Sequence, residues 1–243
     1  MFEIIYFDEI ESTNTFALNN LDSLKDRQVI VANKQTIGKG RLGRKWISDV
    51  EGNIYLSIVL KPSEVYDPKM PLANLTQYMS VLLCRTLEEY GVSANIKWPN
   101  DILINGKKIS GLLSELKIQG NNLKGFVLGV GVNLNLTENY LAQINQPATA
   151  LSLLLNKPIN RDKFISELLN KFFLELDAFM NQGFLFIKDE YVARSEFLGG
   201  RVVINSLNQK EYGIAEAIND DGSLLLNNNS EKKIITIGDL FCL

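Results

Sequence analysis

The chain has 243 residues, enough for one substantial domain or for a large domain with a small one. Its 46% hydrophobic content suits a globular core, and its formal net charge of −3 argues against nucleic-acid binding driven by overall charge. No apolar run reaches the roughly 20 residues that span a bilayer, and acidic residues within positions 1–10 argue against a signal peptide. We therefore expect a cytoplasmic protein with neither nucleic-acid nor membrane partners.

Several catalytic classes are excluded because the residue types they need are missing. The sequence has no histidine, which rules out Ser-His-Asp and Cys-His nucleophiles and histidine zinc sites. Its cysteines, Cys84 and Cys242, are too few and too scattered for a disulfide framework. Chemistry must use cations, carboxylates, amides, backbone groups or a supplied metal ion. Such groups act mainly by positioning the reactants and neutralising charge.

The N-terminal part predicts a strand, a capped helix and a second strand. Residues 4–10 are apolar enough for a strand, and Ser12 or Thr13 then stands where a helix N-cap belongs. On these residues alone, the Ser12-Thr13-Asn14 start needs no role beyond that cap. Residues 29–32 predict a short buried strand that leads into the next segment.

A basic, glycine-rich segment follows at 38–46, with the sequence Gly-Lys-Gly-Arg-Leu-Gly-Arg-Lys-Trp. Glycines let a backbone come close to a ligand, and interleaved lysines and arginines supply donors for carboxylate or phosphate oxygens. This composition predicts a loop that closes over an anionic small molecule. Taken by itself, the segment is interpreted equally well as a solvated basic turn.

The middle of the chain predicts a helix between strands. Residues 53–61 are typical of a strand, and residues 72–90 have helical periodicity that buries Cys84. A hairpin signal, Asn105-Gly106, separates later apolar runs. The strands expected around it span 95–98, 102–104, 109–118 and 123–136. Antiparallel hairpins flanked by helices favour an α+β fold with a mixed, largely antiparallel sheet covered by helices.

The character of the sequence changes near Glu196. Before it, residues 161–181 form a long amphipathic pattern and residues 184–195 also look helical. After it come short β-like runs separated by turn residues, at 201–204, 211–218, 224–226 and 234–237. We predict a domain of residues 1–195 and a small β-barrel of residues 196–243.

Five motifs stand in a fixed order across residues 12–133. They are Ser12-Thr13-Asn14, Gln35 with the 38–46 loop, Lys97-Trp98-Pro99-Asn100-Asp101, Lys108-x-x-Gly111-x-Leu113-x-Glu115, and Gly129-x-Gly131-x-Asn133. Together they resemble the biotin–protein ligases. The resemblance implies a catalytic domain of the class II synthetase and biotin ligase type and an SH3-like C-terminal domain. Relatives that also act as repressors carry an N-terminal winged helix, for which we see no room, so we expect the ligase without that module.

The resemblance implies a two-step reaction. The biotin carboxylate attacks the α-phosphorus of ATP, which releases pyrophosphate and leaves biotinyl-5′-adenylate. A lysine amine of a biotin carboxyl carrier protein then attacks the acyl carbon and releases AMP. Biotin, ATP and Mg²⁺ are the implied small molecules, and the carrier domain of a biotin-dependent carboxylase is the implied partner. A homodimer is left open.

The resemblance also assigns catalytic roles. Lys108 would contact the reacting carboxylate and phosphate, while Lys39 and Arg41 would neutralise them. Asp101 would either hold Mg²⁺ through water or orient the incoming lysine, and both roles stay open. Many relatives have arginine where Lys39 stands, so a bidentate fork is not available at that position. Glu115 is left outside the catalytic set, with a metal or ion-pair role open.

The remaining implied contacts belong to ligand binding. Ser12, Thr13 and Gln35 would bind the polar end of biotin, because each can both donate and accept as a ureido group requires. Trp46 would flank the adenylate, with an ordinary core indole as the alternative. Further implied ligand contacts are Asn14, Gly38, Gly40, Asn100, Gly111, Leu113, Gly129, Gly131 and Asn133.

Two other functions compete with this interpretation. A lipoate or octanoate transferase shares the catalytic fold, but the Lys97–Asp101 motif and the 38–46 loop belong to the biotin branch. Cys84, expected to be buried in a helix, is also badly placed to accept an acyl group. A non-catalytic nucleic-acid binder that uses the basic loop is disfavoured by the net negative charge.

Overall fold

The computed structural model describes residues 2–61, 71–120, 122–206, 209–228 and 231–243. Its larger sheet has the strand order β1-β2-β3-β7-β6-β5-β4. These strands are β1 (Glu3–Ile10), β2 (Gln28–Gln35), β3 (Ile54–Leu60), β4 (Asn95–Lys97), β5 (Asp101–Ile104), β6 (Lys107–Gln119) and β7 (Asn122–Val132). Among the described strands of this sheet, β1 and β2 pair in parallel and all other neighbours are antiparallel. The mixed, largely antiparallel sheet expected from the sequence is confirmed.

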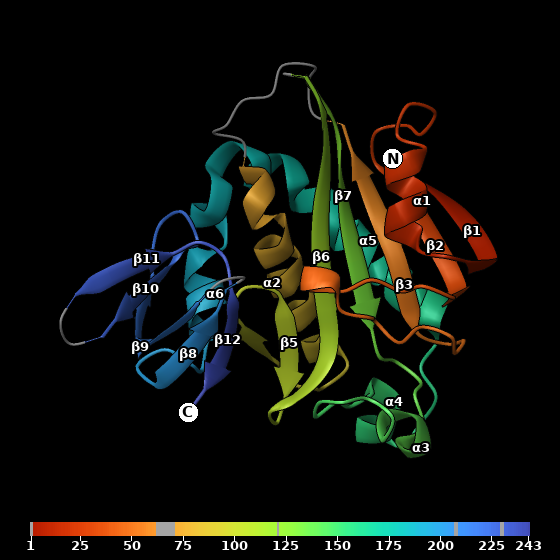
Figure 1. Ribbon diagram of the computed structural model, residues 1–243. Coiled ribbons are helices and arrows are strands. Elements are labelled where there is room, and N and C mark those ends of the chain that lie inside the picture. The colour runs from red at the N-terminus through yellow and green to blue at the C-terminus, as the bar shows by residue number, and fades with distance from the viewer. Residues whose placement is uncertain (1, 62–70, 121, 207–208, 229–230) are drawn as a thin grey trace.

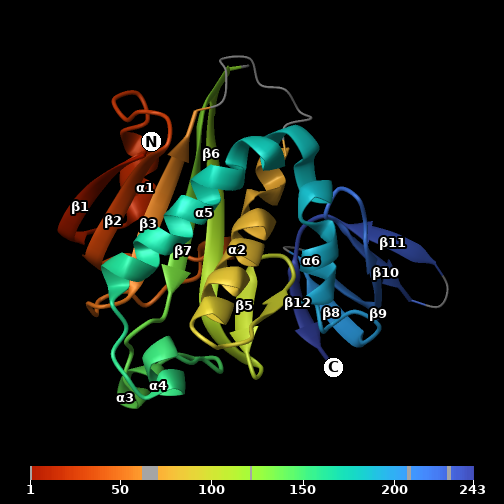
Figure 2. The same ribbon diagram turned by 180° about the vertical axis from the view of Figure 1, so that it is seen from behind.

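Helices cover both faces of this sheet. Helices α2 (Leu75–Glu89) and α5 (Arg161–Gln182) cross one face, and α1 (Thr13–Asn19) lies on the other against β3 and β7 (Figures 1 and 2). Shorter helical segments are η1 (Arg41–Gly43), η2 (Pro71–Asn74), α3 (Glu138–Leu141), α4 (Leu151–Leu155), η3 (Gly183–Phe186) and α6 (Lys188–Ala193). None of the described helices is long and apolar enough to cross a membrane.

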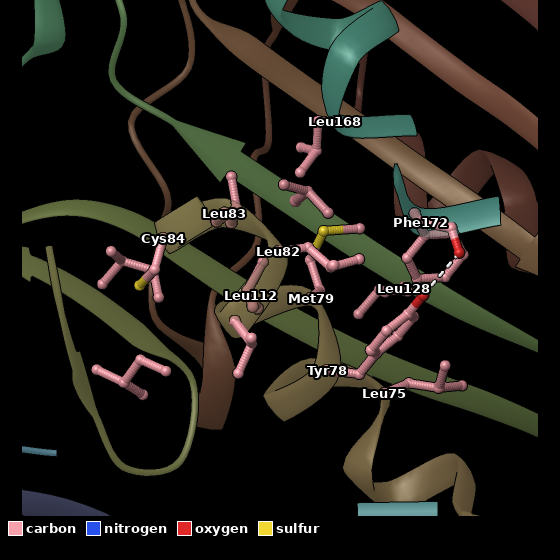
Figure 3. Close-up of a cluster of buried hydrophobic side chains, with 14 of the residues drawn as sticks. Leu75, Tyr78, Met79, Leu82, Leu83, Cys84, Leu112, Leu128, Leu168 and Phe172 are labelled. Carbon is pink, nitrogen blue, oxygen red and sulfur yellow. Dashed lines mark hydrogen bonds between the residues drawn. The ribbon is translucent and has the colours of Figure 1, made fainter. Parts of the chain in front are cut away.

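The main core lies between the sheet and the α2–α5 layer. Figure 3 shows α2 side chains such as Met79 and Leu82 meeting Leu128 of β7 and Leu168 of α5. The Tyr78 hydroxyl is buried there and donates to the Phe172 carbonyl oxygen over 2.8 Å, which satisfies the polar atom. Burying a single large apolar side chain contributes roughly 1.5–3 kcal/mol, so this layer fixes the sheet that carries the site.

The C-terminal residues form a second, antiparallel sheet in the order β11-β10-β9-β8-β12, beside β5 and α6 (Figure 1). Its strands are β8 (Arg201–Asn205), β9 (Lys210–Ile218), β10 (Leu224–Asn227), β11 (Lys232–Ile235) and β12 (Asp239–Cys242). The expected small β domain is present, but the strand pairings of its described residues do not close a barrel. Its inward residues, including Val202 and Leu240, belong to the same apolar cluster as the α2 layer.

A tight turn joins the C-terminal sheet to the larger domain. The Gly222 carbonyl oxygen accepts hydrogen bonds from Gln77 Nε2 at 2.9 Å and from Trp98 Nε1 at 3.1 Å. Asn74 Nδ2 donates to the neighbouring Asp221 carbonyl over 2.9 Å. Trp98 of the Lys-Trp-Pro-Asn-Asp motif is thus a buried residue that anchors the turn, next to residues of the site.

The structure departs from the expected elements in a few places. The pattern over 184–195 divides into η3 and α6, and residues 71–74 form the 3₁₀ turn η2 ahead of α2. The short helices α3 and α4 and the last strand, β12, were not predicted. Helices α3 and α4 have only four and five residues, too few to show a helical period. The expected hairpin at Asn105-Gly106 is confirmed, with φ of 49° and 73° at the two residues.

Candidate active site

A cleft lies where the start of α1, the 38–46 loop and strands β5 to β7 meet; it is partly open to solvent and holds about 780 Å³ of empty space when the solvent at its opening is included. Most of its lining comes from the five sequence motifs. The lining residues are Ser12, Thr13, Asn14, Gln35, Lys39, Gly40, Arg41, Arg44, Lys45, Trp46, Tyr55, Leu56, Asn100, Asp101, Lys108, Gly111, Leu112, Leu113, Gly129, Val130, Gly131, Gln146 and Asp239. Cations and amides thus meet in one depression, although they come from segments far apart in the chain.

The inner end of the cleft is formed by the start of α1. Ser12 is its N-cap, and its side chain accepts from the Thr15 amide, as the sequence predicts. The Thr13 backbone N–H donates to Gln35 Oε1 over 2.8 Å, and Thr13 Oγ1 lies 3.2 Å from the same oxygen. Because Oε1 is held in this way, the other amide atom of Gln35, Nε2, is directed towards Gly38.

A buried polar chain extends from this end along the sheet. The Ser57 hydroxyl lies 2.8 Å from that of Thr13 and 2.5 Å from Asn14 Oδ1. Asn14 Nδ2 donates to Glu115 Oε2 over 2.8 Å. The Asn14 side chain rests on Gly129, where a Cβ would overlap the amide oxygen. The glycine in β7 therefore makes room for Asn14.

The basic loop folds back on itself as a narrow turn. Lys39 and Lys45 form an antiparallel bridge, and backbone bonds of 2.7 Å and 2.9 Å join Gly40 N to Arg44 O and Trp46 N to Gly38 O. At the tip, Leu42 and Gly43 both have positive φ, 54° and 73°. All four loop cations, Lys39, Arg41, Arg44 and Lys45, line the cleft.

Trp46 lies flat against the sheet at the two remaining glycines. A Cβ on Gly131 would come within 2.6 Å of Trp46 Cε2, and one on Gly111 within 3.0 Å of Trp46 Cζ3. The indole Nε1 is buried and has no hydrogen-bond partner among the described residues. Trp46 is thus part of the cleft wall, and the sheet glycines are needed for the close approach of the ring.

Lys108 and Asp101 face each other at the cleft floor. Their Nζ and Oδ1 atoms lie 2.7 Å apart, and only 15% and 16% of the two side chains are exposed. Lys108 Nζ also lies 5.4 Å from the centre of the Trp46 ring. The preceding residue, Lys107, is exposed, as expected for alternating strand positions. One charge of the lysine pair therefore points into the cleft.

Arg41 reaches across the cleft to the C-terminal sheet. Its Nη1 donates to Asn100 Oδ1 over 2.8 Å and lies 3.4 Å from Asp239 Oδ1. Asp239 also forms an ion pair with Arg44. Burial lowers the pKa of Arg41, and the nearby carboxylates of Asp239 and Asp101 oppose that shift. Asp239 therefore holds two arginines of the loop in place.

The structure brings nearly all predicted site residues to this cleft, with two exceptions. Gly38 does not line it and instead packs against Ser48 and the Trp46 carbonyl. Asn133 also lies outside, where its amide donates to the Thr149 carbonyl over 3.1 Å. Lining residues that sequence reasoning missed include Arg44, Lys45, Tyr55, Gln146 and Asp239. The basic loop itself was a signal for the first two, whereas no local pattern marked the others.

The carboxylates of the cleft do not form a metal site made of protein ligands alone. Across the described residues, no three Asp, Glu or Cys side chains gather into a metal-binding group. Asp101 is engaged by Lys108, and Asp239 by Arg41 and Arg44. Mg²⁺ is commonly held by one or two carboxylates together with the substrate's phosphates, so a cage made of protein groups is not required for it.

Comparisons with known proteins agree with this geometry. Residues 6–133 match the model of the biotin/lipoate A/B protein ligase family, and residues 197–242 match the biotin protein ligase C-terminal domain. The chain is 33% identical over 242 residues to the bifunctional ligase/repressor BirA of Bacillus subtilis, covering 98% of this chain and 73% of that protein. It is 28% identical to a biotin–[acetyl-CoA-carboxylase] ligase of Paracoccus denitrificans, over 95% and 97% of the two chains.

A solved structure supports the same assignment across both sheets. The biotin protein ligase of Aquifex aeolicus, in complex with biotin and ATP, superposes with a TM-score of 0.80 at 26% identity. The match covers 99% of this chain and 98% of that one. The chain therefore belongs to the biotin/lipoate A/B protein ligase family, and its C-terminal domain places it among the biotin protein ligases.

Proposed function

We propose that this protein is an ATP-dependent ligase that activates biotin as biotinyl-5′-adenylate and transfers it to a lysine of a biotin carboxyl carrier protein. The observation that carries the proposal is the cleft itself, in which buried amides and hydroxyls at one end meet Lys108, Arg41 and Lys39 at the other. A polar, uncharged head group and a reacting carboxylate on the same molecule would satisfy both ends. The similarity to ligases named for biotin supports it.

We assign the cations to the first step. As the biotin carboxylate attacks the α-phosphate, negative charge gathers on oxygens that Lys108, Arg41 and Lys39 can reach from the lining. Lys108 is a point charge held in a fixed place by Asp101, which reduces the reorganisation needed in the transition state. Mg²⁺, when bound with ATP, would neutralise phosphate charge, and Asp101 would either hold it through water or orient the incoming lysine of the carrier.

We assign the remaining residues to binding. Ser12, Thr13 and Gln35 would hold the ureido ring, while Gly111, Leu113, Gly129 and Gly131 would line the slot for the thiophane ring and tail. Trp46, Asn100 and Gly40 would flank the adenylate. Asn14 and Asn133 would act indirectly, by hydrogen bonds that hold the backbone at Leu113 and at Thr149 in place.

We further propose residues 1–195 as the catalytic domain, 196–243 as the C-terminal domain, and the cytoplasm, where ATP is supplied, as the place of action. The acceptor would be the carrier domain of a biotin-dependent carboxylase such as acetyl-CoA carboxylase, in line with the names of the relatives. A homodimer remains a proposal that solution scattering can test.

Intact-mass analysis of a carrier domain would test the function directly. The carrier is incubated with the protein, Mg-ATP and equal amounts of biotin, lipoate and octanoate, with a lipoyl-type acceptor domain alongside. We expect one biotinyl adduct on the carrier, lost when ATP is omitted. A lipoyl or octanoyl adduct on the second acceptor would instead identify a lipoate or octanoate transferase. If neither an adduct nor pyrophosphate is formed, the ligase function is refuted.

A further inference from the structure

Glu115 has no assigned role, yet it ends a chain of hydrogen bonds that reaches the inner end of the cleft. The chain runs from Glu115 through Asn14, Ser57 and Thr13 to Gln35, over 2.8, 2.5, 2.8 and 3.2 Å in turn. Asn14 and Thr13 are 3% exposed and Ser57 is fully buried. Glu115 does not line the cleft, so any effect it has on a ligand passes through these side chains.

The first link fixes the orientation of the Asn14 amide. Its Nδ2 faces Glu115 Oε2 at 2.8 Å and the Leu113 carbonyl oxygen at 3.4 Å. An ionised carboxylate and a carbonyl can only accept, so the amide nitrogen must stay on this side. The shorter contact is the one to Glu115, which therefore dominates. Asn14 Oδ1 is left to face Ser57.

The second link determines where the hydroxyl protons lie. Asn14 Oδ1 and Ser57 Oγ are 2.5 Å apart, a distance at which two oxygens need a proton between them, and only Ser57 has one to give. Ser57 Oγ also lies 2.8 Å from Thr13 Oγ1. The Thr13 hydroxyl donates its own proton to Gln35 Oε1 over 3.2 Å.

One oxygen at the cleft wall is thus left as an acceptor. Gln35 Oε1 accepts from both the backbone N–H and the hydroxyl of Thr13, whereas Thr13 Oγ1 keeps a free lone pair while the Ser57 proton is bonded to Asn14. That lone pair can accept an N–H group of the ligand, which an apolar head group does not have. A cyclic urea supplies N–H groups next to a carbonyl, and the carbonyl can accept from donors such as Gln35 Nε2.

We propose that Glu115 is a positioning residue that sets the hydrogen-bond direction at the inner end of the cleft, through Asn14 and Ser57, so that Thr13 Oγ1, beside Gln35, accepts an N–H of the ligand head group. This rests on the proposed function, because the head group is taken to be the ureido ring of biotin. The acceptor oxygen matters for direction, because a side chain without an acceptor at position 115 leaves the Asn14 amide free to turn over.

Four variants test this inference. Glu115→Met removes the acceptor at similar length, Glu115→Gln keeps an oxygen that can accept from Asn14, and Ser57→Ala interrupts the chain in the middle. The matched control is Ser80→Ala, because Ser80 is equally buried but its hydroxyl bonds the Thr76 carbonyl in α2. Each variant is measured by biotin calorimetry and by pyrophosphate release at saturating biotin. The same calorimetry uses biotin analogues that are methylated at one ureido nitrogen.

We expect Glu115→Met and Ser57→Ala to raise the biotin Kd by about tenfold, the effect of one lost hydrogen bond, with kcat close to the parent value. Glu115→Gln should stay near the parent, and Ser80→Ala should match it. The parent should discriminate between biotin and the analogue whose methylated nitrogen faces Thr13. Both disrupting variants should discriminate less.

The outcomes separate this inference from the proposed function. If the parent binds biotin and releases pyrophosphate, but Glu115→Met and Ser57→Ala leave both the Kd and the discrimination unchanged, the inference is wrong and the function stands. An equal loss in kcat and in affinity for ATP would mean general damage to the fold and would also overturn it. If the parent itself does not bind biotin, both fall together.

Discussion

At the scale of single residues, the strand alternation of β6 gives two adjacent lysines opposite surroundings. Lys108 is held at 2.7 Å from Asp101 with 15% of its side chain exposed, whereas Lys107 is exposed. A charge that is partly removed from water acts more strongly on a developing anion than a solvated one. The two positions therefore differ in their surroundings although they are chemically identical.

Lys108→Ala should slow biotinyl-adenylate formation by about 10²–10³-fold, the usual cost of one charge-stabilising donor, with a much smaller change in biotin affinity. Single-turnover pyrophosphate release and biotin calorimetry measure the two effects. Lys107→Ala is the control and should behave like the parent. Equal losses in rate and affinity would make Lys108 a simple binding residue.

The cysteines provide a second residue-scale prediction, which bears on the acyl-thiol alternative. Burial raises the pKa of Cys84 to about 12, so the reactive thiolate is scarce until the pH approaches that value. Cys242 is exposed. At pH 8 a thiol reagent should label Cys242 in the folded protein and both cysteines in urea, as read by peptide mass mapping. Rapid labelling of Cys84 in the folded protein would contradict its burial in α2.

At the scale of elements, the 38–46 loop shows a local conflict between sequence and conformation. Leu42 lies in the left-handed region at φ 54° and ψ 37°, which costs a residue with a branched side chain roughly 1–2 kcal/mol. Its side chain is 42% exposed, so packing does not repay much of this cost. Gly43 adopts its φ of 73° freely.

Leu42→Asn should stabilise the folded form of the loop, because asparagine tolerates this region and suits a turn followed by glycine. We expect tryptic cleavage within residues 39–45 to slow by about fivefold, which corresponds to roughly 1 kcal/mol. Leu42→Ala serves as the control, since it shortens the side chain but keeps the strain. Faster cleavage of Leu42→Asn would show that the Leu42 side chain holds the loop.

Much of the architecture could be predicted because periodicity and turn chemistry are local. The apolar faces of α2 and α5, the Asn105-Gly106 turn and the change in character near Glu196 are all visible over short windows. The parallel pairing of β1 with β2 was not predicted, because the register of separated strands depends on the packing of the whole sheet. The short helices α3 and α4 are below the length at which a helical period can be recognised.

The site was predicted as a set of motifs, but several of its contacts could not be. Asp239 lies almost 200 positions from Arg41, and nothing near it in the sequence indicates that it faces the basic loop. The sequence predicts Gly111 and Gly131 as ligand contacts, and the structure shows that both also make room for Trp46. Glycines in a strand indicate that another group comes close to the backbone, but the sequence does not show whether that group is a ligand or a side chain of the protein.

At the scale of the whole molecule, one turn and one continuous core join the two sheets. Gly222 lies at φ 79°, and a Cβ there would come within 2.5 Å of Asn74 Nδ2 and Gln77 Oε1. The backbone carbonyl of the same residue accepts from Gln77 and Trp98. Trp98 is followed directly by Pro99, Asn100 and Asp101. The hydrogen bond from Trp98 to the turn therefore helps to fix the segment that carries Asn100 and Asp101.

Gly222→Ala should lower the free energy of unfolding by about 3 kcal/mol, from left-handed strain together with lost hydrogen bonds. Gly199→Ala is the matched control, because Gly199 has φ 80° but open space around its Cα, and it should cost only about 1 kcal/mol. Urea unfolding followed by circular dichroism measures both. Similar losses in the two variants would show that the contacts at Gly222 contribute little.

The pairing of Asp239 with Arg41 and Arg44 affects how anion binding in the cleft depends on salt. The arginines already have a carboxylate partner supplied by the other end of the chain, so an incoming phosphate exchanges one counter-charge for another. A phosphate that binds then replaces the Asp239 carboxylate as the partner of the arginines, and few salt ions are released from them. Nucleotide affinity should therefore depend only weakly on ionic strength, although the mouth of the cleft is rich in positive charge.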